Sequence, residues 1–143
     1  AALHRAPRKQ EAQTIDDLFK PPIHLMFKRS FAEARQMAME KKRWIVVNIQ
    51  DEKEFASHTL NRDLWNDPQV RDFVNAHCIF LQFPHSHHEG EKVVQFYKPP
   101  SLPAILIIDP RTGQCVDTLI RPHLDKDDFT EKLNYVVAST SLD

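Results

Sequence analysis

The chain has 143 residues, enough for one domain with a buried core, and its 41% hydrophobic and 27% charged residues are typical of a globular protein. Its net charge of −1 gives no overall basic field that would attract nucleic acid or an anionic membrane. No apolar run approaches the ~20 residues of a membrane span, so we expect neither a nucleic-acid partner nor a membrane span.

The two cysteines, Cys78 and Cys115, are far apart, and neither belongs to a C-x-x-C motif. Cys78 lies in an apolar run, where a small buried thiol is the simplest interpretation. Two cysteines provide no disulfide framework, so the sequence indicates a reducing, intracellular compartment. Only two glycines are present, which excludes a glycine-rich phosphate-binding loop.

The N-terminal part divides into a tail and an apolar segment. Residues 1–13 are polar and locally basic, and we expect a disordered tail there. The segment Ile15–Phe27 is apolar but interrupted by Pro21 and Pro22. We expect this segment to pack as an irregular or strand-like piece over one edge of a sheet. Any exposed part of it would be a partner surface.

The first predicted helix begins after Ser30, because Ser30 and Glu33 form an S-x-x-E capping box. The β-branched run Trp44–Gln50 follows and predicts a fully buried central strand. The next stretch, DEKEFASHTLNRDLW, begins polar and becomes helical. Another helix starts at Asp67-Pro68, with aspartate as the cap and proline at the first helical position.

The second half of the chain supplies three more strands and two helices. Cys78–Phe83 is a second buried strand, and the helix Glu89–Tyr97 is expected to turn Val93, Phe96 and Tyr97 inward. The strands Ala104–Asp109 and Gln114–Arg121 form a hairpin around the turn at 110–113. The last helix opens at Asp125 and Asp128, and its core face carries Phe129, Leu133, Val136 and Val137.

The resulting order is α-β-α-β-α-β-β-α. Strands that are separated by helices are expected to pair in parallel through crossovers, and the last two strands form a hairpin. The sequence therefore predicts an α/β fold with a mixed four-stranded sheet flanked by helices. This arrangement resembles that of thioredoxin-like proteins.

The run SLP before the third strand carries the first site prediction. In thioredoxin-like proteins the corresponding loop holds a cis-proline, and Leu102-Pro103 occupies this place. In redox enzymes of this fold the proline faces a C-x-x-C motif at the start of the helix after the first core strand. The N-terminus of that helix lowers the pKa of a cysteine.

The spacing to LNRDLW places the two cysteine positions near Glu54 and Ser57. Neither side chain is a thiol, so thiol–disulfide exchange by a C-x-x-C motif is excluded. We therefore expect a thioredoxin-like scaffold without the C-x-x-C active site, with no catalytic residue, no cofactor and no metal.

Two chemical alternatives arise from neighbouring side chains. Ser57 and His58 suggest a hydrolytic nucleophile and base, but adjacent residues seldom place the base on the nucleophile. We favour a solvated first helical turn. The histidines His85, His87 and His88 suggest a metal site, but no paired cysteines accompany them, and we favour a polar loop at a helix N-terminus.

Pro103 has two interpretations. It marks a groove in which an extended peptide pairs with the backbone beside Leu102, which requires no thiol. Alternatively, it only shapes the turn into a buried strand, and the residues alone favour this second interpretation. Backbone groups left open beside Pro103 would favour peptide binding.

Five stretches resemble the UAS domain of UBX-domain proteins: DDLFKPPIHLMFKRSF, WIVVNIQ, EFASHTLNRDLWND, QFYK and ILIIDPRTGQ. We expect the domain to span residues 14–138, with a C-terminal tail at 139–143. The resemblance implies a thioredoxin-like fold without oxidoreductase activity and a location in the nucleus and cytoplasm.

Full-length members of this family are adaptors in the ubiquitin–proteasome pathway. The resemblance implies that the parent protein links ubiquitinated substrates and cullin-RING ligases to the AAA ATPase valosin-containing protein. Ubiquitin-binding and UBX modules would make those contacts, and none of them is visible in this chain. Other UAS domains bind long-chain unsaturated fatty acids and self-associate, which gives an alternative function. A basic patch beside an exposed apolar groove would favour that alternative.

Overall fold

The computed structural model describes residues 19–143, so the predicted tail at 1–13 lies outside the described residues. The elements are α3 (Phe31–Lys41), β1 (Trp44–Gln50), α4 (Phe55–Leu60), the π-helical turn η2 (Asn61–Trp65), α5 (Pro68–His77), β2 (Cys78–Pro84), α6 (His88–Tyr97), β3 (Ala104–Ile108), β4 (Cys115–Leu119) and α7 (Lys126–Ser139). The predicted order of helices and strands is confirmed.

The four strands form one sheet in the order β2-β1-β3-β4. The sequence prediction of parallel pairing is right for β1 and β2 but wrong for β3, which runs antiparallel to β1. The last residue of β2, Pro84, lies beside Gln50, and the first residue of β3, Ala104, lies beside Ile49. The connection through α6 therefore starts and ends at the same end of the sheet. Because the chain does not return to the opposite end, β3 runs antiparallel to β2 and β1.

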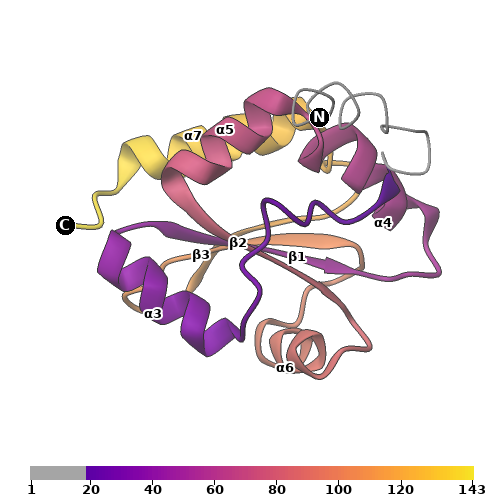
Figure 1. Cartoon of the computed structure of the whole chain (residues 1–143), viewed down its shortest axis with the longest axis horizontal. Helices are drawn as coiled ribbons and strands as arrows, with labels where there is room; N and C mark the ends of the chain where they lie inside the picture. The colour runs from indigo at the N-terminus through magenta and orange to yellow at the C-terminus, as the bar shows by residue number, and fades with distance from the viewer. Residues whose placement is uncertain (1–18) are drawn as a thin grey trace, which may run out of the picture.

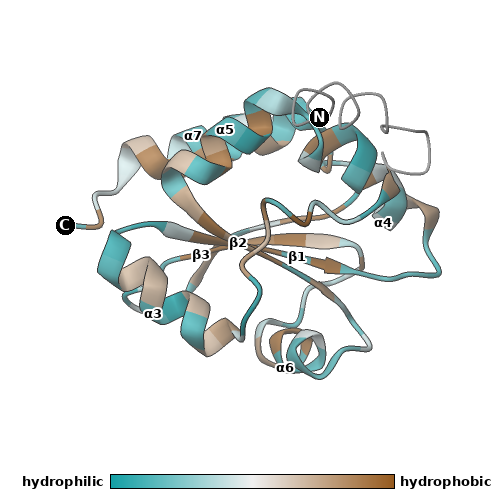
Figure 2. Cartoon of the chain, viewed as in Figure 1, coloured by the Kyte–Doolittle hydropathy of each residue, from teal (hydrophilic) through white to brown (hydrophobic). Residues whose placement is uncertain are grey.

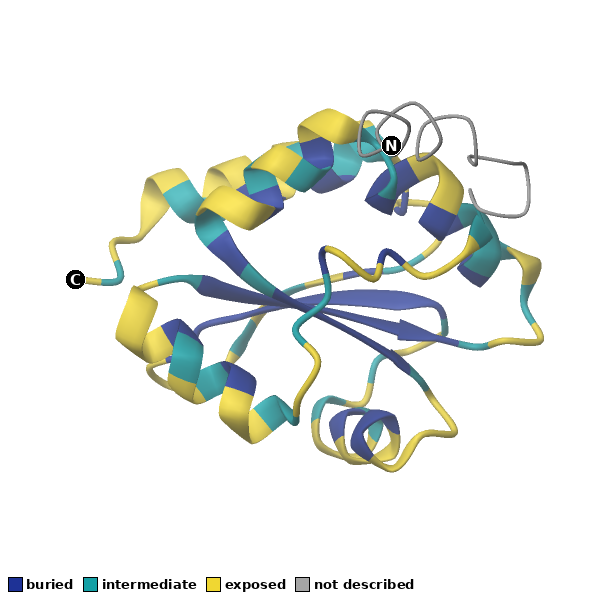
Figure 3. Ribbon diagram, in the orientation of Figure 1, coloured by how far each residue is buried: buried dark blue, intermediate teal, exposed yellow. Residues whose placement is uncertain are grey.

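Helices cover both faces of the sheet (Figure 1). One face packs against α5 and α7, and the other packs against α3 and α6. The central strands are brown in the hydropathy view and dark blue in the burial view, whereas the outward helix faces are polar and exposed (Figures 2 and 3). Burial of apolar strand residues on both faces is the main source of stability in such a sheet.

The helix starts follow the predicted caps. Ser30 and Glu33 make both bonds of the capping box. The Asp67 carboxylate accepts a hydrogen bond from the Val70 N–H, and the Asp125 carboxylate accepts one from Asp128. These local signals therefore set the positions of α3, α5 and α7.

Phe96 is a correction to the sequence prediction. It was expected to face inward, but it is 75% exposed. The buried face of α6 is centred on Gly90, Val93 and Tyr97. At about 100° per residue, Phe96 lies at the edge of that face and projects beyond it. A large aromatic side chain is thus left on the surface.

The segment before α3 packs along the free edge of β2. Met26 forms an isolated bridge with Phe80, and the Phe27 N–H donates to the Phe80 carbonyl at 2.7 Å. Leu25 is buried, whereas Ile23 is 53% exposed. This confirms the predicted packing over a sheet edge for the described part of the segment, and it protects that edge from pairing with another chain.

The turn between β3 and β4 depends on a nearly buried aspartate. Asp109 accepts hydrogen bonds from the backbone N–H and the guanidinium of Arg111. The guanidinium hydrogen bond is the main reason why the pKa of Asp109 lies below its usual value of 3.8. The ionised carboxylate therefore stabilises the folded state.

Asp109→Asn is expected to lower the free energy of unfolding by about 1–3 kcal/mol at neutral pH, because a charge-assisted hydrogen bond is lost. Since the folded pKa is depressed, this contribution is present above the unfolded pKa and disappears as the pH falls through the folded value. Urea unfolding of both proteins across the acidic range checks this. A difference that stays constant with pH would contradict the assignment.

Candidate functional site

The candidate site begins where the chain leaves β1 and enters α4. Glu54 is the N-cap residue of α4, but its side chain makes no capping hydrogen bond. Its carboxylate lies 3.7 Å from the Arg121 guanidinium, and both side chains are about half exposed. An ion pair of this kind contributes little to stability, so Glu54 remains available at the surface.

Ser57 is wholly buried, so the predicted solvated first turn is wrong at this residue. Its hydroxyl oxygen accepts a hydrogen bond from the Asp51 N–H at 3.0 Å, and its carbonyl accepts one from the Gln50 side chain. These two hydrogen bonds of Ser57 therefore hold the loop after β1 in place on its buried side.

Ser57→Ala is expected to lower the free energy of unfolding by about 1–2 kcal/mol, because the Asp51 N–H loses its acceptor. Partner binding should be retained, since the hydroxyl is not at the surface. Chemical unfolding measures the first effect and an affinity measurement the second. Ser101→Ala, at an exposed position, is the control for a serine-to-alanine change. Equal stability of both variants would show that the hydroxyl is dispensable.

His58 does not act on Ser57. Its Nε2 donates to the carbonyl of Glu52 at 2.9 Å, and the Ser57 hydroxyl is already bonded to the Asp51 N–H. The two side chains are therefore not arranged as a nucleophile and its base.

A network of buried amide side chains lies beneath the site. Asn48 Oδ1 accepts hydrogen bonds from Gln50, Gln82 and the indole N–H of Trp65, at 2.9–3.1 Å. Asn61 Oδ1 accepts from the same two glutamines. Because β1, β2 and η2 each contribute side chains, this hydrogen-bond network fixes the position of η2 relative to the sheet. Sequence reasoning missed it, because its members come from three separate segments.

The loop before β3 meets the end of β1. The Leu102–Pro103 peptide bond is cis, and the pairing of Ala104 with Ile49 puts this bond beside the loop that leads to Glu54. Pro103 is buried, and Leu102 is half-buried. Among residues 19–143, no hydrogen-bond partner satisfies the N–H or C=O of Leu102. Both backbone groups are therefore free to pair with a ligand.

A second cis bond, Arg121–Pro122, was not predicted. Arg121 is the residue that pairs with Glu54, so the loop that contains Pro122 also lies beside the site. Nothing in the local sequence distinguishes this proline from an ordinary turn proline.

An aromatic pair with one exposed ring and one half-buried ring borders the site. Phe55, at the start of α4, is 68% exposed and lies 6.1 Å, centroid to centroid, from Phe19. The guanidinium of Arg62 lies 5.1 Å from the centre of the Phe19 ring. Exposed aromatic rings of this kind are typical of protein-binding surfaces. The pair joins residues far apart in sequence, so sequence reasoning did not find it.

The three histidines do not converge on one point: His87 and His88 both contact Glu89, whereas His85 lies beside Asp51. His85 Nε2 lies 3.5 Å from an Asp51 carboxylate oxygen, and His88 Nε2 lies 3.4 Å from Glu89. His87 caps α6, where its Nδ1 accepts from the Glu89 N–H. Within the described part of the chain, no three His, Cys, Asp or Glu side chains are grouped to hold a metal ion.

The two thiols are free and lie in different strands. Burial raises the pKa of the Cys78 thiol to about 12, which suppresses the reactive thiolate. Cys115 is partly exposed, and its Sγ donates to the Asp117 carbonyl.

A chromogenic disulfide reagent is expected to modify Cys115 in the native protein and Cys78 only after unfolding, because a buried thiol with a raised pKa supplies almost no thiolate. Absorbance during labelling, with and without denaturant, measures both phases. Cys115→Ser should remove the fast phase. Rapid modification of Cys78 in that variant under native conditions would contradict its burial.

A second surface feature lies between α3, α6 and the β3–β4 turn. It is a groove of about 500 Å³, bordered by Phe31, Arg35, Lys92, Val93, Phe96 and Tyr97. The groove lies on the α3–α6 face of the sheet, whereas α4 and η2 lie on the other face. Its lining includes none of the site residues Glu54, Ser57, Leu102 and Pro103, although Leu102 packs against the same apolar cluster, so the groove is a second surface. No helix in the range 19–143 has both the length and the apolar character that a membrane crossing requires.

A family model described as thioredoxin-like matches residues 26–110. The chain is 42% identical over 109 residues to plant UBX domain-containing protein 7 of Arabidopsis thaliana, covering 76% of the chain and 22% of that protein. It is 38% identical over 132 residues to UBX domain-containing protein 2 of Schizosaccharomyces pombe, covering 92% of the chain and 31% of that protein. The chain thus spans about a fifth to a third of these relatives.

Among solved structures, a thioredoxin from Thermus thermophilus superposes with a TM-score of 0.67 and 20% sequence identity. The match covers 78% of the chain and 87% of the thioredoxin. This similarity confirms the predicted thioredoxin-like fold.

Proposed function

The chain belongs to the thioredoxin-like family, as the UAS-type domain of UBX proteins, and we propose that it acts as a non-catalytic protein-interaction domain. The single observation that carries the proposal is the surface beside cis-Pro103. It offers the open backbone groups of Leu102 and the exposed ring of Phe55, which follows Glu54, one of the two predicted cysteine positions.

The open backbone at Leu102 suits an extended peptide. A peptide strand gains affinity from main-chain hydrogen bonds and specificity from its side chains. Phe55 and Phe19 supply an apolar surface for one such side chain, and Arg62 supplies a charge next to it. Because Glu54 and Ser57 replace the thiol positions, the bound peptide would be held and not oxidised or reduced.

The wider role follows from the family resemblance. We propose that the parent protein links ubiquitinated substrates and cullin-RING ligases to valosin-containing protein in ubiquitin-dependent degradation, in the nucleus and cytoplasm. The relatives carry the UBX name and are longer than this chain, which supports a parent protein with further modules. In that arrangement, ubiquitin and the ATPase bind elsewhere, and this domain contributes its own protein contact.

Affinity capture from cell lysate tests the proposal, with the 143-residue chain as bait and Phe55→Ser as the matched variant. Phe55 is exposed, so its replacement should leave the fold intact. We expect enrichment of ubiquitin-pathway proteins on the wild-type chain and a loss of about tenfold on the variant, as for a central aromatic contact. Equal enrichment on both baits, or none above an empty matrix, would contradict a protein contact at this surface.

Binding of a long-chain unsaturated fatty acid, with self-association, is the second candidate. The groove between α3 and α6 favours it, because apolar side chains lie there beside Arg35 and Lys92, which could pair with a carboxylate. It ranks second because the polar side chains of Ser30 and Thr112 interrupt the apolar lining that an acyl chain needs. A titration with oleate, followed by light scattering, would detect both binding and self-association.

A further inference from the structure

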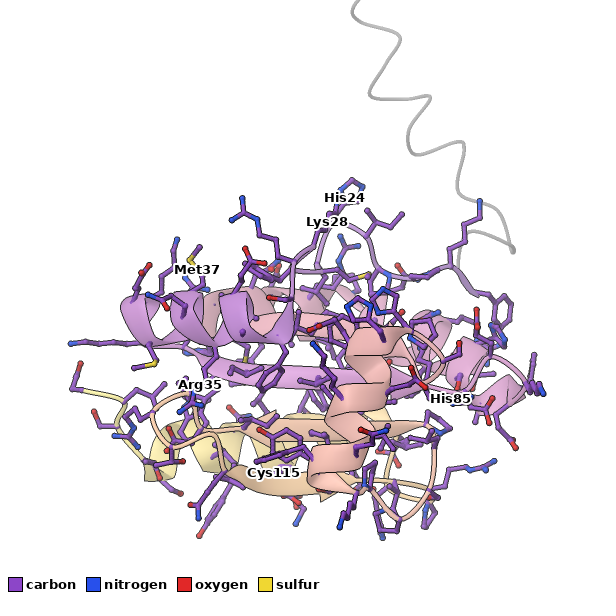
Figure 4. All side chains as sticks on the ribbon, turned by 90° about the horizontal axis from the view of Figure 1, so that it is seen from below. His24, Lys28, Arg35, Met37, His85 and Cys115 are labelled. Carbon is purple, nitrogen blue, oxygen red and sulfur yellow. The ribbon has the colours of Figure 1, made fainter. Side chains whose placement is uncertain are left out.

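The α3–α6 groove has a preformed wall. Arg35 donates from Nε to the Pro110 carbonyl at 2.7 Å and from Nη2 to the Arg111 carbonyl at 3.2 Å. The Tyr97 hydroxyl donates to the Gly113 carbonyl at 2.7 Å. These bonds tie the β3–β4 turn to both helices, so the groove exists before any ligand arrives, and binding would require little reorganisation. Figure 4, which views this face, shows Arg35 on α3 near that turn.

One aromatic side chain of the apolar lining is strongly exposed. Phe96 projects at the rim with 75% of its area exposed, and it packs edge-on against Tyr97 at 4.8 Å. Phe31 meets Tyr97 from the opposite helix at 6.1 Å. Three aromatic rings and Val93 thus form one apolar surface, large enough to receive a bulky side chain.

The charges at the groove favour an anionic ligand. Glu89 is already compensated, because its carboxylate accepts from the Phe31 N–H at 2.8 Å and pairs with Lys92 and His88. Nη1 of Arg35 has no hydrogen-bond partner among residues 19–143, and the Lys92 side chain is 71% exposed. Arg35 and Lys92 against the single carboxylate of Glu89 thus leave a net positive charge at this apolar surface.

We infer that this groove binds a short acidic peptide, in which one bulky apolar side chain lies against Phe96 and Tyr97 and flanking carboxylates pair with Arg35 and Lys92. The partner is thus a protein segment with an apolar residue between Asp or Glu residues. This surface is separate from the one beside Pro103, so either proposal can fail alone.

A peptide fits this surface better than an acyl chain does. An acyl chain gains affinity in proportion to the apolar area that it removes from water, and therefore requires apolar walls along its whole length. This groove mixes its aromatic rings with Glu89 and the hydroxyl groups of Ser30 and Thr112. A peptide needs the apolar surface for one side chain only and can use the polar groups along its backbone.

Selection from a phage-displayed library of random heptapeptides tests the inference, with the 143-residue chain immobilised. Three baits are compared: wild type, Phe96→Ser and Phe55→Ser. Both phenylalanines are exposed, so neither change should unfold the chain, and each removes one aromatic ring from one surface. We expect enriched peptides with a bulky apolar residue flanked by carboxylates. Their affinity should fall at least about tenfold on Phe96→Ser and stay unchanged on Phe55→Ser.

Charge gives a second readout for the selected peptides. Replacing their Asp and Glu residues by Asn and Gln should weaken binding several-fold, and Lys92→Gln should weaken the acidic peptides more than their amide versions. The inference is overturned if no peptide is enriched, if the enriched peptides lack carboxylates, or if Phe55→Ser and not Phe96→Ser removes binding. A titration with oleate that shifts the NMR signals of the groove, without any enriched peptide, would assign the groove to an acyl chain instead.

Discussion

Replacement of Asn48 by leucine is expected to lower the free energy of unfolding by about 3 kcal/mol. Within residues 19–143, Asn48 Oδ1 is the one acceptor of the Trp65 indole N–H, and it also accepts from Gln50 and Gln82. Leucine has the same branched side-chain shape but no acceptor, so buried donors would lose hydrogen bonds that water cannot replace. The Asn48 amide also donates to the Ala104 carbonyl, and this tie to the Pro103 loop would be lost as well.

Urea unfolding, followed by tryptophan fluorescence, measures the effect. Asn134→Leu is the matched control, because Asn134 is exposed on α7 and should change stability by no more than about 0.5 kcal/mol. A loss below about 1 kcal/mol for Asn48→Leu would show that the amide network is not needed to hold the site to the sheet.

Gly90→Ala is expected to destabilise the protein by about 1–3 kcal/mol, against the usual effect of this change in a helix. Alanine normally stabilises a helix relative to glycine by roughly 1 kcal/mol. Here the added methyl group would clash with the Pro84 carbonyl oxygen and would lie 3.2 Å from the Phe83 Cβ. Neither the strand backbone nor the buried Phe83 can move away easily, so α6 would be pushed from the sheet.

Thermal or chemical unfolding of Gly90→Ala shows directly whether the change lowers or raises the stability of the protein. Gln95→Ala, at an exposed position of the same helix, should be nearly neutral and reports on helix propensity alone. An increase in stability for Gly90→Ala would mean that α6 does not pack closely on the end of β2.

The elements that could be predicted from sequence have local signals. The capping box at Ser30 and the aspartate caps at Asp67 and Asp125 each act within one helical turn, so the residues that cause the structure are adjacent. The run Trp44–Gln50 is buried at every position, as its β-branched content indicated. The antiparallel direction of β3 has no such signal, because it depends on where α6 returns the chain.

The candidate site was predicted only in part, for the same reason. The order of elements and the spacing along the chain supplied the positions of Glu54, Ser57 and Pro103, but the roles of Ser57 and the buried amides depend on distant contacts. Ser57 accepts hydrogen bonds from the Asp51 N–H and the Gln50 side chain, and Asn48 accepts one from Gln82 in the neighbouring strand. The prediction that Phe96 lies in the core was wrong because α6 packs on the sheet through Gly90, which turns Phe96 towards the surface.

Amide hydrogen exchange, on the chain alone and with a captured ubiquitin-pathway partner, tests the central proposal most directly. The Leu102 N–H has no hydrogen-bond partner in the described structure and should exchange rapidly in the free protein. If a partner peptide pairs with this backbone, exchange should slow markedly at Leu102 and around Phe55 in the complex. Protection confined to other surfaces, with unchanged exchange at Leu102, would contradict a protein-binding role for the site beside Pro103.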